Sequence, residues 1–345
     1  MSRPTPKPSD FAIRFLIVGL ISCTASTNAL AAVFANYTPS RHDRFLSDGS
    51  VNNDFIMAGF DLSGISLGTP GDGTTGGVDP IGGTSRAILI TPQHYISANH
   101  ASTTTPRFRG SDGVIRSYTS SSSTQLTTTR ADGTSDPSDI RLFTLSAPIP
   151  ESDLVNPFAI YSGSTNLLVG EEFFLISNPS VNADESLTHR AGMNVIRDVE
   201  EVGFGAAGTS PTTNIYYTFD TAANGGSNGT GGDTLGIDEA GLIGGDSGNP
   251  ALIAIDGQLA VLGTHFGISV PSGKSASAGD FYHNYSTLLT PYLSEIEMLT
   301  AADGQSIYRL SISVTAVPEP SSALLLFFVA AGGMHRRSRR PSNRK

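Results

Sequence analysis

The sequence predicts an all-β fold with a single late helix. Charged residues make up only 15% of the 345 residues, glycine occurs 38 times, and serine and threonine are abundant. This composition is typical of many short strands joined by turns and differs from that of a helical bundle. Short apolar runs bounded by turn residues recur along the chain, whereas apolar residues recur at helical spacing in one segment.

The expected strands are short apolar segments flanked by turn residues. Before residue 86 the chain is rich in Gly, Ser and Asp, and residues 55–60 are the one candidate strand there. Residues 110–129 are polar and indicate an exposed hairpin or loop, and residues 221–232 form a Gly/Asn loop. The remaining expected strands are residues 87–90, 95–98, 140–145, 172–176, 215–219, 251–255 and 259–264.

A hairpin turn and a helix complete the expected elements. Asp256-Gly257, between the last two strands, is a strong signal for a two-residue hairpin turn. The helix is expected at residues 288–299, where Leu289, Leu293, Ile296 and Leu299 recur at helical spacing.

The N-terminus has the features of a secretory signal peptide. Residues 1–14 are basic and polar, and the apolar run at residues 15–21 is too short to span a bilayer. Ala29-Leu30-Ala31 then provides small residues at the spacing that signal peptidase requires. We therefore expect a signal peptide at residues 1–31 and Ala32 as the first residue of the mature chain.

The single cysteine and the charge distribution limit the partners of the chain. Cys23 ends a segment that resembles a lipobox, so a lipidated Cys23 is the alternative to cleavage before Ala32. After residue 31 there is neither a disulfide nor a thiolate ligand, and the seven histidines show no ligand spacing, so we expect no metal and no cofactor. The net charge is -10 although both ends are basic, which disfavours nucleic acid and anionic lipid as partners.

Three ordered features mark the C-terminus. Pro318-Glu319-Pro320 is followed by an apolar run at residues 323–331 and by an arginine cluster at residues 336–340. In this order they resemble the PEP-CTERM sorting signal of Gram-negative bacteria, which implies cleavage by exosortase and export to the cell surface or extracellular matrix. The alternative is a plain transmembrane helix, for which the run is short. We place a linker at residues 301–316 and the signal at residues 317–345.

The strongest functional motif is Gly-Gly-Asp-Ser-Gly-Asn-Pro at residues 244–250. Glycines on both sides of a serine let the backbone curl so that N–H groups converge beside the hydroxyl. The motif resembles the Gly-Asp-Ser-Gly-Gly-Pro nucleophile loop of chymotrypsin-like serine proteases, with Asn249 in place of a glycine. The resemblance implies that Ser247 is the nucleophile and that the N–H groups of Gly245 and Ser247 form an oxyanion hole.

Two further segments resemble the same family. Residues 87–101 resemble its strand, turn, strand and Thr-Ala-Ala-His-Cys segment, which makes His100 the general base and places Ala101 at the cysteine position. Ser-Asp-Ile-Arg-Leu at residues 138–142 resembles the segment whose aspartate orients the histidine. We assign that role to Asp139, with Asp136 as the alternative. His94, in the turn, is expected to be a polar surface residue.

The order His100, Asp139, Ser247 is that of chymotrypsin and differs from the subtilisin and α/β-hydrolase orders. The resemblance covers roughly residues 55–300 and implies two antiparallel β-barrels, at residues 32–155 and 156–300, the second with the helix. We expect a secreted, monomeric serine endopeptidase that hydrolyses protein or peptide substrates through an acyl-enzyme. The alternative is a catalytically weak surface or matrix binding protein on the same scaffold.

The expected substrate-binding residues are Gly241, Leu242, His265, Phe266 and Gly267. Gly241 stands where trypsin-like members carry an aspartate, and a pocket without that carboxylate disfavours Lys and Arg. The strand at residues 263–267 resembles both the general pocket wall of the family and a glutamyl endopeptidase strand whose histidine receives glutamate. His265 is therefore either an uncharged wall residue or a glutamate receptor. We expect cleavage after uncharged or apolar residues, then Glu, with Lys and Arg last.

Asp246 matches an aspartate that, in animal members of the family, pairs with an N-terminal amine freed by proteolysis. No Ile-Val-Gly-Gly-like start stands at the proper distance, since Ile-Gly-Gly at residues 81–83 lies too close to the histidine motif. The sequence leaves open whether cleavage activates the protein.

Overall fold

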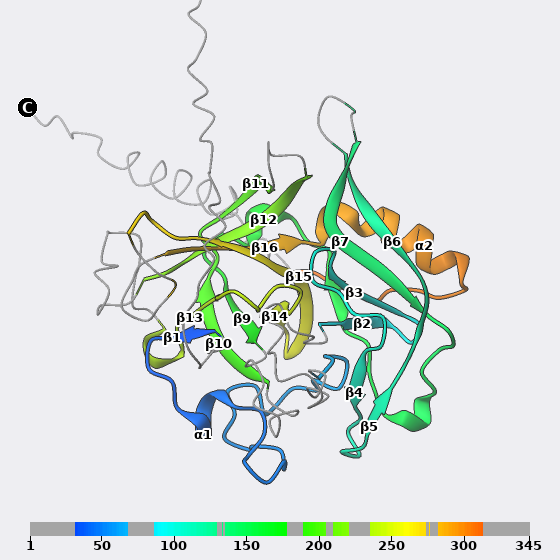
Figure 1. Cartoon of the computed structure of the whole chain (residues 1–345), viewed down its shortest axis with the longest axis horizontal. Helices are drawn as coiled ribbons and strands as arrows, with labels where there is room; N and C mark the ends of the chain where they lie inside the picture. The colour runs from blue at the N-terminus through cyan, green and yellow to red at the C-terminus, as the bar shows by residue number, and fades with distance from the viewer. Residues whose placement is uncertain are drawn as a thin grey trace, which may run out of the picture. The chain divides into compact units, whose positions relative to one another are not determined.

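The computed structural model describes residues 32–67, 86–129, 133, 135–177, 189–204, 210–220, 235–273, 276 and 282–312 (Figure 1). The expected signal peptide, the Gly/Asn loop at residues 221–232 and the sorting signal lie outside these ranges. Contacts divide the chain into residues 1–311 and 312–345, and every helix and strand described below belongs to the first unit.

Strands dominate the described residues, which confirms the all-β prediction. Two short α-helices accompany them, α1 (Pro39–His42) and α2 (Leu293–Ala302). The strands are β1 (Val33–Phe34), β2 (Ile88–Thr91), β3 (His94–Ala98), β4 (Arg107–Arg109), β5 (Ile115–Ser117), β6 (Ser120–Thr129), β7 (Ser135–Leu145), β8 (Ala159–Tyr161), β9 (Glu172–Ser177), β10 (Arg190–Val195), β11 (Asp198–Phe204), β12 (Ser210–Phe219), β13 (Ala240–Gly241), β14 (Pro250–Ile255), β15 (Gln258–Ser269), β16 (Tyr282–Leu288) and β17 (Arg309–Leu310).

Two sheets carry most of these strands. One has four strands in the order β2-β3-β7-β6. The other has nine, with β10-β9-β14-β15-β16-β12-β11 as its main path, β8 paired with β15, and β17 paired with β8. Contacts between β3 and β15 and between β7 and β12 place the two sheets against each other (Figure 1). The pairings between described residues leave both sheets open, so barrel closure, which the family resemblance implies, is not seen in them.

The hairpin between β14 and β15 follows the sequence prediction. Asp256 and Gly257 have φ values of 50° and 79° and join paired strands by a two-residue turn. Positive φ at both positions matches the right-handed twist of the flanking strands, which explains the Asp-Gly pair. β15 then continues to Ser269, past the expected end at residue 264, and its register against β16 shifts between His265 and Gly267.

Two segments differ from the prediction. Residues 55–60 form turns and no strand. The apolar side chains that suggested a strand, Phe55 and Met57, are buried in the core from these turns. Residues 110–129 include the turn and second strand of an expected hairpin, which β4 and β5 form, but they continue into the long strand β6, which pairs with β7 over most of its length. Its outer face is exposed, so only Leu126 supplies the apolar signal that would have predicted a strand there.

The main core lies between the two sheets and the C-terminal helix. Ile96 and Ile140 from the smaller sheet pack in one cluster with Leu252 and Val261 from the larger sheet and with Ile296 of α2. The helix begins at Leu293, later than expected, because β16 extends to Leu288 and a 3-10 turn at Thr290–Tyr292 follows. Pro291 in that turn fits a helix start, where no backbone N–H is required.

Candidate active site

The pairing of β3 with β7 brings His100 beside Asp139. Ala98, the last residue of β3, lies opposite Ile140 of β7, so the turn after β3 meets the residue that precedes Ile140. The N–H of Asn99 donates to the carbonyl of Asp139 at 2.7 Å and fixes this meeting point. Asp136, the alternative orienting residue, lies further along β7 opposite Thr128.

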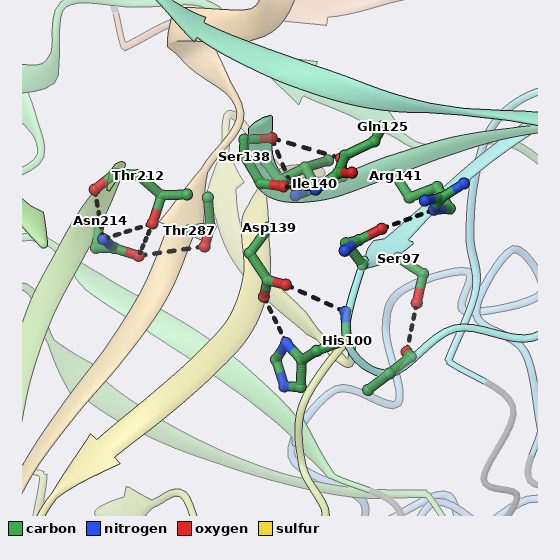
Figure 2. Close-up of polar contacts among 12 residues, drawn as sticks. Ser97, His100, Gln125, Ser138, Asp139, Ile140, Arg141, Thr212, Asn214 and Thr287 are labelled. Carbon is green, nitrogen blue, oxygen red and sulfur yellow. Dashed lines mark hydrogen bonds and ion pairs between the residues drawn. The ribbon is translucent and has the colours of Figure 1, made fainter. Parts of the chain in front are cut away.

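Asp139 holds both the ring and the backbone of His100 (Figure 2). Its Oδ2 lies 2.6 Å from His100 Nδ1, and its Oδ1 accepts the His100 backbone N–H at 3.1 Å. The Asp139 side chain is 10% exposed and the His100 side chain 45% exposed. Because a carboxylate only accepts hydrogen bonds, the imidazole proton stands on Nδ1, and the lone pair of Nε2 is available to a substrate or a nucleophile.

Neighbouring hydrogen bonds hold the backbone around His100 and Asp139 (Figure 2). The N–H of Ile140 donates to the hydroxyl of Ser138, and the amide of Gln125 on β6 donates to the Ser138 carbonyl. The guanidinium of Arg141 donates to Asn99 Oδ1 at 2.8 Å, which ties β7 to the turn that carries His100. The backbone on either side of the pair is therefore held independently of the pair itself.

The loop at residues 244–250 has the curled backbone that the glycines predict. Gly245 and Gly248 have φ values of 110° and 85°, which favour glycine. The loop is tied by the Gly248 N–H, which donates to the His265 carbonyl at 2.9 Å, and by the Asn249 N–H, which donates to the Asp246 carbonyl at 3.1 Å. Within the described residues the N–H groups of Gly245 and Ser247 have no acceptor, so both are available to an external oxygen.

This loop lies directly on the turn that follows β3. A Cβ atom built on Gly248 would lie 2.8 Å from the Ala101 carbonyl oxygen, next to His100. The Phe266 ring, whose centroid is 6.4 Å from that of His100, lines the same cavity as Ser247. No hydrogen bond between described residues joins Ser247 to His100. Ser247 and His100 thus lie on adjoining segments, and no hydrogen bond joins their side chains.

The cavity beside Ser247 contains most of the expected substrate-binding residues. It measures about 60 Å³ and is lined by Leu242, His265, Phe266 and Gly267, among others. Gly241 is absent from its wall: it lies in β13, where an added Cβ would meet the Tyr282 hydroxyl at 2.5 Å. Sequence reasoning missed the two apolar wall residues Ile243 and Ile268.

His265 is buried and uncharged. Its Nδ1 contacts the hydroxyl of Ser286 at 2.9 Å and its Nε2 contacts the carbonyl of Ile176 at 3.0 Å. Burial lowers the pKa of His265 to about 3. Both ring nitrogens are occupied and the ring is neutral at neutral pH, so this geometry favours the uncharged wall residue over the glutamate receptor.

Asp246 belongs to the loop at residues 244–250, and the residue is buried, with 1% of its surface exposed. Its Oδ1 accepts the Ser177 hydroxyl at 2.5 Å, and its Oδ2 accepts the N–H of Ile243 at 2.9 Å and that of Ala32 at 3.3 Å. The sequence contains no Ile-Val-Gly-Gly-like start that would predict an N-terminal partner for this carboxylate. The structure places one there, because β1 pairs with β13 and carries Ala32 to Asp246.

His94 differs from its predicted surface position. It is fully buried, with Nδ1 against the Thr91 hydroxyl at 2.8 Å and Nε2 against Asp303 at 3.0 Å. It begins β3 instead of lying in an exposed turn, and Asp303, which directly follows α2, contacts it. Among the residues that the structure describes, no group of three or more His, Cys, Asp or Glu side chains is arranged to hold a metal ion.

Comparison with protein families identifies one segment. The PEP-CTERM protein-sorting motif matches residues 316–340, which confirms the predicted C-terminal signal. In a comparison with curated proteins, none matched the chain. No helix in the described ranges is long and apolar enough to cross a membrane, and the apolar run at residues 323–331 lies outside those ranges. The chain is a substrate for exosortase processing and is exported and sorted to the cell surface of a Gram-negative bacterium.

Proposed function

We propose that the protein is a serine endopeptidase in which Ser247 is the nucleophile, His100 the general base and Asp139 the residue that orients the base. The observation that carries this proposal is the two-point contact of Asp139 with His100, with the ring partly exposed beside the Ser247 loop. An aspartate that only capped a turn would not need to fix the tautomer of a neighbouring imidazole.

The proposed reaction follows the Ser-His-Asp template. Ser247 Oγ attacks the scissile carbonyl carbon while its proton passes to His100 Nε2, and Asp139 stabilises the imidazolium. The carbonyl oxygen becomes an oxyanion that accepts hydrogen bonds from the N–H groups of Gly245 and Ser247. The proton then passes to the leaving amine, an acyl-enzyme remains, and water, activated by His100, releases the product and restores Ser247.

The proposal includes the two-barrel arrangement of chymotrypsin-like proteases. It is supported by the division of the site between the sheets. His100 and Asp139 belong to the turn after β3 and to β7 of the four-stranded sheet, whereas Ser247 lies in the loop before β14 of the nine-stranded sheet. Contact between β3 and β15 brings these two parts together.

The proposed substrates carry an uncharged or apolar side chain before the scissile bond. Leu242, Ile243, Phe266 and Ile268 give the cavity an apolar wall, and about 60 Å³ suits a small side chain. Its one acidic lining residue, Asp246, is committed to three buried hydrogen bonds. A cationic side chain there would be desolvated without a partner.

Covalent labelling tests the function. A fluorophosphonate should modify Ser247 in the purified chain, and peptide mass spectrometry should find the adduct at that residue. Ser247→Ala should abolish labelling, while Ser121→Ala on the exposed strand β6 should leave the labelling rate unchanged. Labelling that persists in Ser247→Ala, or an adduct at another serine, would refute the assignment.

The second candidate is a catalytically weak binding protein on the same scaffold. The observation that favours it is the unmade hydrogen bond between Ser247 and His100. Catalytic hydrogen bonds are often long in ligand-free proteases and tighten with substrate. The two candidates are distinguished by the labelling rate: a binding protein should react with the fluorophosphonate no faster than free serine.

A further inference from the structure

The turn after β3 is held from β7 at two successive residues. Asp139 and Arg141 flank Ile140, whose side chain packs in the main core, and both reach the turn. Asp139 Oδ2 lies 2.6 Å from His100 Nδ1. One residue earlier in the turn, Asn99 Oδ1 accepts a hydrogen bond from Arg141 Nε at 2.8 Å. The side chains of Asn99 and His100 are therefore held by two different residues of β7.

The sheet itself gives His100 limited support. The β3–β7 ladder ends at Ala98, two residues before His100, and the His100 side chain is 45% exposed. The contacts of His100 with Asp139 fix the ring relative to the carboxylate, but the two side chains can still move together with the turn. A second attachment of the turn, made through a different side chain, restricts that movement.

The Arg141 side chain is itself attached at a second point. Its Nη1 donates to Ser123 Oγ on β6, the edge strand of the four-stranded sheet, at 2.9 Å. A guanidinium is planar and its N–H groups diverge at fixed angles, so bonds to two acceptors fix the orientation of the whole group. Arg141 with its bonds to Asn99 and Ser123, here called the Arg141 brace, thus connects β6 to the turn that carries His100.

We propose, resting on the proposed function, that Arg141 is a positioning residue for His100 and acts through Asn99. Arg141 exchanges no proton with the substrate and forms no bond to it. The Arg141 brace limits the movement of the turn, so that His100 Nε2 stays within reach of the Ser247 hydroxyl when the proton passes. A displacement of about 1 Å at such a site costs on the order of 10²-fold in rate.

The test removes the Arg141 brace from either end. Arg141→Met keeps much of the aliphatic length of the side chain and removes both bonds, and Asn99→Ala removes the acceptor. We expect each change to lower the maximal rate of fluorophosphonate labelling of Ser247 by roughly 10- to 100-fold. The reagent concentration that gives half of this rate should stay unchanged, because the brace does not contact the reagent. The double variant should fall no further, since both changes remove the same contact.

A conservative variant and a matched control accompany these changes. In Arg141→Lys an ammonium can still donate to Asn99 Oδ1, so this variant should recover most of the rate. Arg116→Met on β5 removes ion pairs with Asp112 and Asp153 in a separate two-stranded sheet, and it should label at the wild-type rate. Melting curves show whether each variant is folded.

A second measurement is independent of catalysis. The proton on His100 Nδ1, held by Asp139, should give a downfield NMR resonance in a chain with ¹⁵N-labelled histidine. In Arg141→Met this resonance should broaden, because a mobile turn exposes the proton to exchange with water. In Arg116→Met it should stay sharp.

The outcomes separate the positioning role from the proposed function. Wild-type labelling in Arg141→Met, additive losses in the double variant, an equal loss in Arg116→Met or an unchanged resonance in Arg141→Met overturns the positioning role and leaves the proposed function intact. A wild-type chain that labels no faster than free serine refutes the proposed function and the positioning role with it.

Discussion

At His100 a single carboxylate binds the ring nitrogen and the backbone N–H of the same residue, so the position of the residue and the tautomer of its ring are fixed together. This matters because only the tautomer with its proton on Nδ1 leaves Nε2 able to take a proton from Ser247. The buried His265 is the opposite case, since both of its nitrogens contact protein atoms and its role is structural.

Asp139→Asn should leave the fold intact and remove most of the activity. An asparagine that turns its NH2 toward Nδ1 favours the other tautomer and so removes the base. The expected fall in kcat is about 10^4-fold, as known for the equivalent change in chymotrypsin-like proteases. Asp136→Asn, three residues earlier on β7, is the matched control and should be unchanged. A loss of activity in the control instead would transfer the orienting role to Asp136.

His265 should make the fold sensitive to acid. Its pKa falls from 6.5 to about 3 on burial, so between these values the unfolded chain binds more protons than the folded one. Its contribution to stability is full above pH 6.5 and is lost as pH falls toward 3, at about 1.4 kcal/mol per pH unit. His265→Gln should reduce the slope of the free energy of unfolding against pH by that amount, as measured by urea titration. Parallel slopes for the two proteins between pH 6 and 4 would contradict this.

At the scale of elements, the site depends on one close contact between a loop and a turn. Gly248 has a positive φ and no room for a side chain against the Ala101 carbonyl, so the Ser247 loop approaches the turn after β3 more closely than any other residue type would allow. The β3–β7 register then sets where His100 stands relative to Asp139.

Gly248→Ala should therefore displace Ser247, the proposed nucleophile, without removing any of the proposed catalytic groups. A displacement of about 1 Å costs on the order of 10²-fold in rate, and kcat/KM should fall by that scale. Gly59→Ala is the control, because a Cβ there meets nothing within 4 Å and its φ is not positive. The pair is measured by peptide hydrolysis and thermal melting. Full activity in Gly248→Ala would show that the contact does not position the loop.

At the scale of the whole molecule, the sorting signal and the candidate site belong to separate parts of the sequence. The sorting motif at residues 316–340 follows the last described strand, β17, in the sequence, and the residues of the candidate site all precede that strand. The N-terminal segment is different, since the backbone N–H of Ala32 donates to Asp246, the residue before Ser247.

Truncation after Thr315 should change where the protein is found and leave its catalysis unchanged. Without the sorting motif, exosortase has no recognition sequence, so the protein should shift from the cell envelope to the medium. Fractionation with immunoblotting measures the distribution, and fluorophosphonate labelling measures the site. An unchanged distribution would count against exosortase sorting of this chain.

Local patterns predicted much of the fold. Apolar runs between turn residues located β2, β3, β9 and β14 to within one or two residues, because each is a short buried strand. β16 escaped prediction. Its Asn284, Ser286 and Thr287 are polar yet buried, and only hydrogen bonds to distant segments make that burial favourable.

The sequence alone determined the all-β class, the sorting signal, the Asp256-Gly257 turn and the residue types of the candidate triad, because each is encoded in a few consecutive residues. Only the tertiary structure decided that Gly241 stays out of the cavity, that His94 and His265 are buried and that Ala32 reaches Asp246. Each of these depends on contacts between residues far apart in the chain. Residues 32 and 246 are separated by 214 positions, and no local pattern specifies which strands will meet across such a distance.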